Sequence, residues 1–512
     1  MRYLFLVGLS LLAFEAGAAT GSAAADTFYV RPSADCVNNG DGMAYACAAS
    51  AGASGAWRTS AAVSYSTTTG VDDGDTLKFC GNFVEADLDT GAYFIFLAST
   101  VTAANEAGRI TITGDCSADG GPSTATVTGG ATMTIGFAMS VSDYITLQNF
   151  EFRDINQVVG NTCSPASDPD APIFRNITGR GITNAGAAMS FNGVGYLADN
   201  IDIETAGEPI FICNGTTNVS AGTVRNARLV TTSTTDENAD GIQQESGGGS
   251  ITLENVSVYK SNPFKGCGLV GSALGAVKVD GFYCYYTGTS AAITGLAVDG
   301  SAAGGYVRNL WSNAPGSALL LRDDVTAFAG TFDVSTMICA GVERCISLDG
   351  AHPAGAFTFY QVSGWATGEW LYAVASFNPL SAVFRNMYVD APTALDINAS
   401  VAAADIDIDY TRYGPTVANW SWRGTTDTTF AAYQVTSSKD ANSAVADPAF
   451  LGGTNPTSAD GFKLKPDSTL CRAGTYVGKL KDYWGRSVDI LDPSIGAMDC
   501  NAEYRTDILT RE

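Results

Sequence analysis

The chain has 512 residues, a formal net charge of −24 and a low share of charged residues, 16%. Its 28 Lys and Arg residues are scattered, whereas phosphate binding needs clustered basic residues, so composition argues against nucleic acid and anionic membrane surfaces as partners. Abundant glycine (57 residues) and many small and β-branched residues favour β-structure over helical bundles.

Residues 1–25 are typical of a signal peptide. Arg2 precedes an apolar run at residues 4–14, which is too short to span a bilayer. Small residues at 21–25 then form an A-x-A-like cleavage site before Asp26. No later stretch reaches a transmembrane length without charges or glycines. We therefore expect a secreted protein, extracellular or periplasmic, without a membrane span.

The twelve cysteines agree with export, because an oxidising compartment allows an even number to pair. The absence of a C-x-x-C motif and the single histidine argue against a zinc site. Pairing of nearest neighbours predicts six disulfides: Cys36–Cys47, Cys80–Cys116, Cys163–Cys213, Cys267–Cys284, Cys339–Cys345 and Cys471–Cys500.

A short pattern recurs along the chain: an asparagine followed by an apolar residue and usually by a second apolar residue two positions later. The asparagines are Asn149, Asn176, Asn200, Asn226, Asn255, Asn309 and Asn386. They are separated by 27, 24, 26 and 29 residues and then by 54 and 77, two and three steps of about 26. A fixed period of this length indicates stacked repeats, and the alternation within each copy indicates strands. We expect the asparagines to stack from coil to coil, near the core.

These features predict an all-β fold, a single right-handed parallel β-helix of about eleven or twelve coils over residues 71–440. Residues 26–70 are expected to cap its N-terminal end. Residues 441–512 are expected to close the other end, because an open last coil would expose a template for edge pairing.

Both ends carry further motifs. The first are DTFYVRP at 26–32 and DGDTL at 73–77; the last are DPAF at 447–450, GFKL at 461–464, DYWGR at 482–486 and IGAMD at 495–499. Together with the repeats, they resemble secreted bacterial members of the right-handed parallel β-helix superfamily, which includes pectate lyases, polygalacturonases, alginate lyases and epimerases, and phage tailspikes. The resemblance implies a glycan chain bound in a groove along the stack.

A second row of strands is expected in the other half of each repeat. Its predicted inward residues are Ile242, Leu269, Ile293, Leu319, Ile346, Leu371 and Leu395. In this register Gln243, Glu245, Arg322, Asp349 and Tyr372 face outward, since a slip of one residue would expose Leu321 and Leu348 instead.

The same register predicts a candidate catalytic cluster. Asp299, Asp324 and Asp349 are separated by 25 and 25 residues, which places one acid per coil along one side. Arg322, His352 and Tyr372 lie beside them. The second choice of site is the face from Asp240 to Glu245. The alternative interpretation is structural: Asp-Gly turns and a surface ion pair between Arg322 and Asp349.

Residues 238–242, NADGI, resemble the N-T-D-G-I motif of polygalacturonases, which would make Asp240 a catalytic acid. The family's Asp-Asp pair should follow one coil later. Residues 260–265 stand there instead, and Asp323 and Asp324 come three coils late. The pattern of alginate and chondroitin lyases is also absent. Neither activity is supported by its motif.

The favoured function is a secreted polysaccharide-degrading enzyme, either a lyase or a glycoside hydrolase. In a lyase, Asp323, Asp324 and Asp349 could hold Ca²⁺, and Arg322, Tyr372, His352 or Lys265 could take the substrate proton. In a hydrolase, two of the acids would act as general acid and as base or nucleophile.

The alternative is a non-catalytic extracellular protein, a glycan-binding or surface β-helix. Outward aromatic residues such as Tyr372, Trp365 and Trp370 would fit that use. The sequence leaves the oligomeric state open.

Overall fold

The computed structural model describes residues 25–500 apart from 39, 52–53, 59–70, 72, 88–92, 98–104, 131–132, 140–143, 162–169, 184–185, 214–219, 233–238, 245–247, 262, 289, 291 and 325. The expected signal peptide, apart from its last residue, and Glu245 lie outside the described residues.

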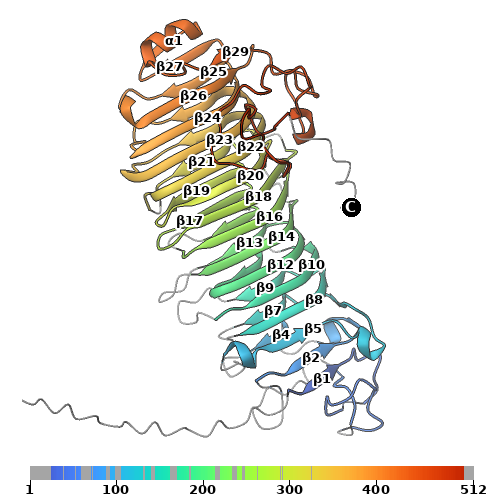
Figure 1. The fold of residues 1–512 in the computed structure, drawn as a ribbon. Helices are drawn as coiled ribbons and strands as arrows, with labels where there is room; N and C mark the ends of the chain where they lie inside the picture. Colours follow the sequence, from blue (N-terminus) through green and yellow to red (C-terminus); the bar gives the residue numbers. More distant parts are fainter. Residues whose placement is uncertain are drawn as a thin grey trace, which may run out of the picture.

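The chain forms a parallel β-helix, an elongated stack of about ten coils that runs from the N-terminal strands to α1 (Figure 1). The predicted all-β solenoid is confirmed. Each coil contributes strands to two rows, which we call the first row and the second row.

The first row holds the longer strands. Its members are β1 (Thr27–Val30), β2 (Thr76–Phe79), β5 (Ile110–Thr113), β8 (Ile145–Arg153), β10 (Ile173–Ile182), β12 (Val194–Thr205), β14 (Ala221–Thr231), β16 (Ile251–Lys260), β18 (Val277–Tyr286), β20 (Gly305–Ser312), β22 (Ala329–Leu348), β23 (Ala354–Ala373), β24 (Ser381–Asp390), β26 (Ile406–Tyr413) and β29 (Ala444–Val445). The short β3 (Asn82–Phe83) pairs with β6 (Ala125–Thr128), and β6 pairs with the second half of β8.

The second row holds the shorter strands. Its members are β4 (Tyr93–Leu97), β7 (Ile135–Met139), β9 (Gln157–Asn161), β11 (Ala187–Phe191), β13 (Glu208–Ile212), β15 (Ile242–Gln244), β17 (Gly268–Ser272), β19 (Leu296–Ser301), β21 (Ser317–Arg322), the last parts of β22 and β23, β25 (Thr393–Ile397) and β27 (Asn419–Trp422).

The recurring asparagine marks a corner inside seven of the first-row strands. All seven asparagines have left-handed backbone, with φ between 51° and 63°. Asparagine visits this region more readily than most residues because its short polar side chain can bond locally. The strand register places Asn226 beside Asn255 and Asn255 beside Gly281, so the corners stack in one column. The repeat is therefore a backbone requirement as well as a hydrogen-bonding pattern.

The predicted amide ladder is present, but it lies on the outside of the stack. The Nδ2 atom of Asn176 donates to Oδ1 of Asn149 at 2.7 Å, and that of Asn200 donates to Asn176 at 2.8 Å. Asn226 interrupts the ladder by donating to Asp199 at 3.0 Å. Asn176, Asn200 and Asn226 are exposed. The expectation that the ladder lies near the core is wrong for these coils, because a left-handed corner turns its side chain outward.

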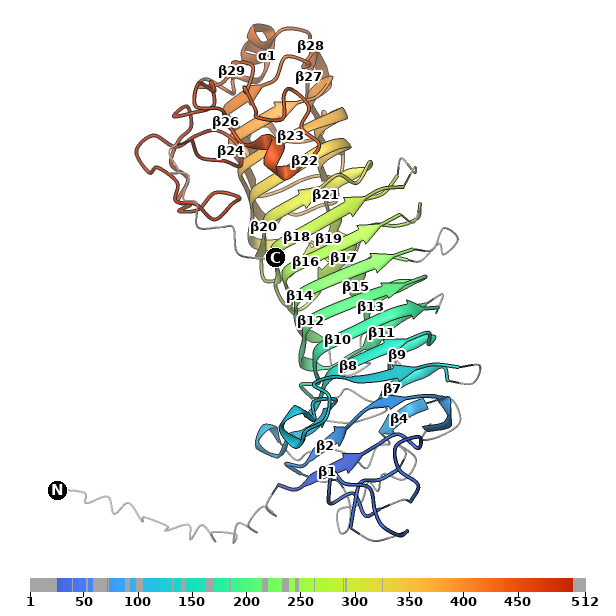
Figure 2. The same cartoon turned by 90° about the vertical axis from the view of Figure 1, so that its right-hand side faces the viewer.

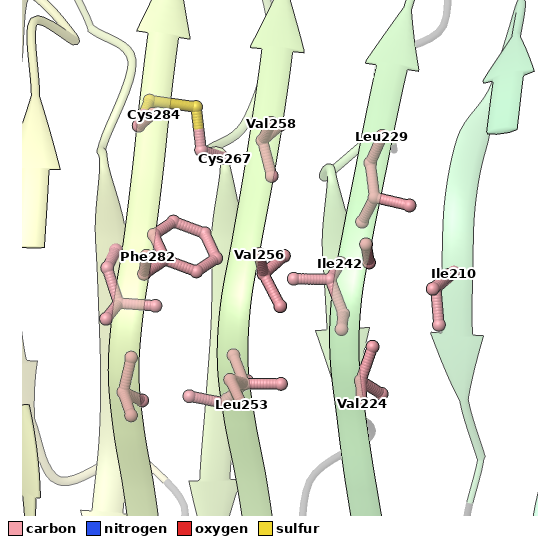
Figure 3. Close-up of a cluster of buried hydrophobic side chains, with 14 of the residues drawn as sticks. Ile210, Val224, Leu229, Ile242, Leu253, Val256, Val258, Cys267, Phe282 and Cys284 are labelled. Carbon is pink, nitrogen blue, oxygen red and sulfur yellow. A yellow bond between two sulfur atoms is a disulfide. The ribbon is translucent and has the colours of Figure 1, made fainter. Parts of the chain in front are cut away.

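Alternate apolar side chains of both rows fill the interior as one continuous core. Figure 3 shows Val256 and Val258 of β16 facing Ile242 of the second row, with the Cys267–Cys284 disulfide beside them. Period-two alternation in the sequence and inward packing in the structure therefore agree.

Five of the six predicted disulfides form: Cys36–Cys47, Cys80–Cys116, Cys267–Cys284, Cys339–Cys345 and Cys471–Cys500. Their Cα–Cα distances of 5.4 to 5.8 Å are ordinary for such bridges. The sixth predicted pair includes Cys163, which lies outside the described residues.

The last coil is covered by α1 (Phe430–Ser437) and by β28 (Thr425–Asp427), which pairs antiparallel with β27. Tyr433 of α1 and Tyr413 both donate hydrogen bonds to the buried Asp440 at 2.8 Å. A short helix and a hairpin thus close the open edge.

Residues 446–500 do not close the end, contrary to expectation, but lie along the side of the stack (Figures 1 and 2). Phe450 packs on Tyr388 of β24, and Trp365 of β23 donates to the carbonyl of Pro456 at 2.7 Å. Their apolar side chains form a second core with first-row residues such as Trp311. None of the helices in the described ranges is long and apolar enough to cross a membrane.

The corner can be tested at Asn255, which is exposed and has φ of 53°. We expect Asn255→Ala to destabilise the protein by about 1–2 kcal/mol relative to Asn255→Gly, because alanine resists the left-handed conformation whereas glycine does not. Both variants lose the hydrogen bond to Asn226, so they form a matched pair. Thermal unfolding compares them, and equal stability would contradict the corner's role.

Candidate functional site

The second row corrects part of the predicted register. Ile242 pairs with Gly268, and Gly268 pairs with Leu296, so Leu269 does not belong to the inward column. Ile293 is buried in the core, as predicted, but it lies before β19, and Leu296 takes its place in the register. A Cβ at Gly268 would meet the Phe282 ring at 2.9 Å. The space inside Gly268 is therefore filled by the Phe282 ring. Because glycine has no apolar side chain, the sequence pattern points to the adjacent Leu269 instead. From Leu319 onward, the register is as predicted.

Arg322 faces outward at the end of β21, as predicted, but its partners differ from the expected Asp349. Its Nη2 lies 3.3 Å from Oδ2 of Asp299, and its Nη1 lies 2.9 Å from Oδ2 of Asp324. We call Asp299, Arg322, Asp324 and Asp349 the exit-edge cluster, because they lie in the last half of second-row strands or just after them. Within it, the guanidinium is flanked by two carboxylates.

The remaining acids of the predicted cluster are engaged separately. Asp349 accepts hydrogen bonds from Ser376 Oγ and from its neighbour's backbone N–H, both at 2.7 Å. Asp323 accepts one from the Ala351 backbone N–H at 2.8 Å. In the part of the chain that the structure describes, no three His, Cys, Asp or Glu side chains are grouped to hold a metal. Asp323, Asp324 and Asp349 are therefore not gathered into one group.

His352 lies in the loop between β22 and β23, but it is fully buried, so the expectation that it is accessible to a substrate is wrong. Its Nδ1 accepts from the Phe328 backbone N–H at 3.3 Å, which leaves Nε2–H to donate to the Asp349 carbonyl at 2.7 Å. Phe328 and Phe377 pack edge-to-face against the ring. Burial, the main cause, lowers the pKa of His352, since it disfavours the charged form.

Tyr372 faces outward on the second row, as predicted, and is partly exposed. The Arg344 guanidinium lies over its ring, 4.3 Å from the centroid. The two other aromatic candidates are not available: Trp370 is buried, and Trp365 lies against residues 446–500.

A second group of charges lies where the chain enters the second row. Asp240 is only 2% exposed, and its Oδ1 accepts a hydrogen bond from the Gly266 backbone N–H at 2.7 Å. The preceding residue, Lys265, is exposed and has a left-handed backbone with φ of 56°. A buried carboxylate on one coil therefore holds a strained, lysine-bearing turn on the next, and such strain is concentrated at functional sites.

Lys260, at the end of β16, completes this group. It is 1% exposed, and its Nζ donates to the carbonyl of Ala239, the residue before Asp240. We call Asp240, Lys260 and Lys265 the entry-edge cluster. Lys260 is absent from the predicted site residues, although it continues the inward alternation of Val256 and Val258. A lysine at an inward strand position was the signal that could have found it.

The electrostatics of Asp240 connect the two edges. Burial is the largest effect and raises the pKa of the Asp240 carboxyl. The hydrogen bond from Gly266 and the positive charges of Lys260, Lys265 and Arg322 act in the opposite direction. Three cations from two coils therefore act on one buried carboxyl, although the whole chain is strongly acidic.

The single histidine allows a direct test of its burial. We expect its imidazole to titrate below the ordinary value of about 6.5, because the folded protein disfavours the charged ring. The unfolded chain binds this proton more readily, so His352 contributes a loss of stability as the pH falls through that range. NMR of selectively labelled histidine measures the midpoint, and His352→Gln identifies the signal. A midpoint at or above the ordinary value would contradict a buried ring.

Comparison with protein-family models finds no match, and comparison with curated protein sequences finds none either. Among solved structures, the chain is similar to the crystal structure of pectate lyase Pel9A, with 14% sequence identity and a TM-score of 0.37 over 93% of this chain and 98% of that chain. At this level of similarity the fold assignment rests on the chain's own strand pairing, and that pairing defines a single parallel β-helix.

Proposed function

We propose that this chain is a secreted polysaccharide lyase that cleaves a uronate-containing glycan by β-elimination. The observation that carries the proposal is the hydrogen bond from Gly266 to the buried Asp240, which holds Lys265 in an exposed left-handed turn. Lys265 is the proposed base. The solvent-facing side of the second row is the proposed binding surface for the glycan.

The chemistry needs a base beside the carbon that loses its proton. The base removes the proton from the carbon next to the carboxylate, a carbon–carbon double bond forms, and the glycosidic C–O bond breaks with its electrons moving to the leaving oxygen. That oxygen takes a proton from water. In the proposal Lys265 accepts the first proton.

The alternative of a hydrolase needs two carboxylates that face each other across the scissile bond. Asp240 is buried, Asp324 is bound to Arg322, and Asp349 is bound to Ser376. This arrangement favours the lyase.

Export is part of the same proposal. Its support is the set of five disulfides, since these persist in oxidising compartments, together with the signal-peptide pattern of residues 1–25.

Activity on polygalacturonate, alginate and other uronate glycans, followed as absorbance of the unsaturated product at about 235 nm, tests the proposal. We expect Lys265→Ala to lower kcat by about 10²–10⁴-fold, the usual contribution of a general base. Asp240→Asn should lower it less, because the amide keeps an oxygen that can accept from Gly266. The matched control is Lys278→Ala, an exposed lysine on β18 in the first row, which should leave activity unchanged.

Three outcomes would contradict the proposal. New reducing ends without absorbance would indicate a hydrolase, and binding without cleavage would indicate the non-catalytic alternative. Full activity of Lys265→Ala, together with loss in Asp324→Asn or Asp349→Asn, would move the site to the exit-edge cluster.

A further inference from the structure

The solvent-facing side of the second row has a defined chemical character along its length. The residues of the outward parity that follow one another from coil to coil are Gln243, Leu269, Ala297, Leu320, Ser347, Tyr372 and Asp396. Ala297 and Ser347 are buried between their neighbours, and the other five are partly exposed. The middle of this column is apolar or small, whereas the entry-edge and exit-edge clusters beside it are charged. A pyranose ring has apolar faces and a rim of hydroxyls, so an apolar strip with polar edges suits a chain of sugars.

Tyr372 is the aromatic member of this column, and its ring is held in place. Arg344 lies over the ring, and its Nε is 3.1 Å from Oε2 of Glu369. A second contact of 3.3 Å joins Arg344 to Glu343. A ring that is already fixed loses little conformational entropy when a ligand binds, so it is well suited to recognition.

The distance between Tyr372 and the proposed base follows from the register. Gly268, three residues after Lys265, is connected to Leu371 through Leu296, Leu319 and Ile346, which makes four coil steps. At a strand spacing of about 4.8 Å, four steps span about 19 Å. A glycan that reaches from Lys265 to Tyr372 therefore contains several sugar residues.

We infer that Tyr372 forms a remote sugar-binding subsite, and that the protein consequently acts within long glycan chains. This inference rests on the proposed function, because it places the reacting sugar at Lys265. The apolar strip guides the chain between the two points, and the Tyr372 ring stacks on a sugar some four coils from the bond that breaks.

The test compares uronate oligosaccharides of increasing length. We expect kcat/KM to rise with length until the chain spans the four coils. Tyr372→Ala should lower kcat/KM about tenfold for the long chains and leave kcat/KM for the short chains unchanged, in line with the loss of one aromatic contact. Tyr372→Phe should keep the rise, since stacking does not need the hydroxyl. The matched control is Tyr306→Ala, a first-row tyrosine whose ring lies 4.1 Å from the Arg308 guanidinium.

A binding measurement separates this inference from the proposed function. The Lys265→Ala variant, with and without Tyr372→Ala, is titrated calorimetrically with the same oligosaccharides. If the wild type cleaves the oligosaccharides but Tyr372→Ala does not change their length-dependent binding, the subsite alone is overturned. Binding that depends on Tyr372 without any cleavage would overturn the lyase and keep the subsite. Failure of every oligosaccharide to bind would overturn both.

Discussion

Each coil has to turn a corner inside its longest strand while it keeps hydrogen bonds to the coils on both sides. A left-handed residue at one fixed position solves this problem, and the register pairs each such residue with the next. The later members of the column are Thr336, Gln361 and Tyr410, which adopt the same conformation at φ of 53° to 56°. Because the corners stack in line, the second-row strands stack in line as well. Lys265, Arg322 and Tyr372 are brought to one side of the molecule by this alignment.

The fold was predictable because its main signal is periodic. A corner that favours asparagine leaves that residue at a regular spacing, and alternating apolar residues reveal the strands around it. The disulfides were predictable for a related reason: chain segments that are close in a stack are also close in sequence. The outward orientation of the asparagine amides was not predictable. Period-two alternation describes an extended strand, and it does not apply across a residue with left-handed backbone.

The candidate site was predicted only in part. Arg322 and Tyr372 lie outward as expected, because the buried Leu321 and Leu371 that precede them fix the parity of their strands. His352 was misjudged because its sequence neighbourhood is that of a loop, whereas its burial comes from Phe328 and Phe377 on other segments. Lys260 was missed because a charge is assumed to face water. Its contact with Ala239 depends on a turn from the preceding coil, and no pattern in one sequence shows it.

In a solenoid each repeat contacts only its neighbours, so the stack can in principle fray coil by coil. Residues 446–500 change this for the C-terminal half. Lys479 bonds to Asp333 of β22, Pro456 to Trp365 of β23, and Thr475 to Asn386 of β24. One segment thus contacts several coils, not all of which contact one another. These coils form a block that should unfold together instead of one coil at a time. Since this segment follows the coils in the chain, it is synthesised after them, and the block is sealed only once the coils beneath it have been made.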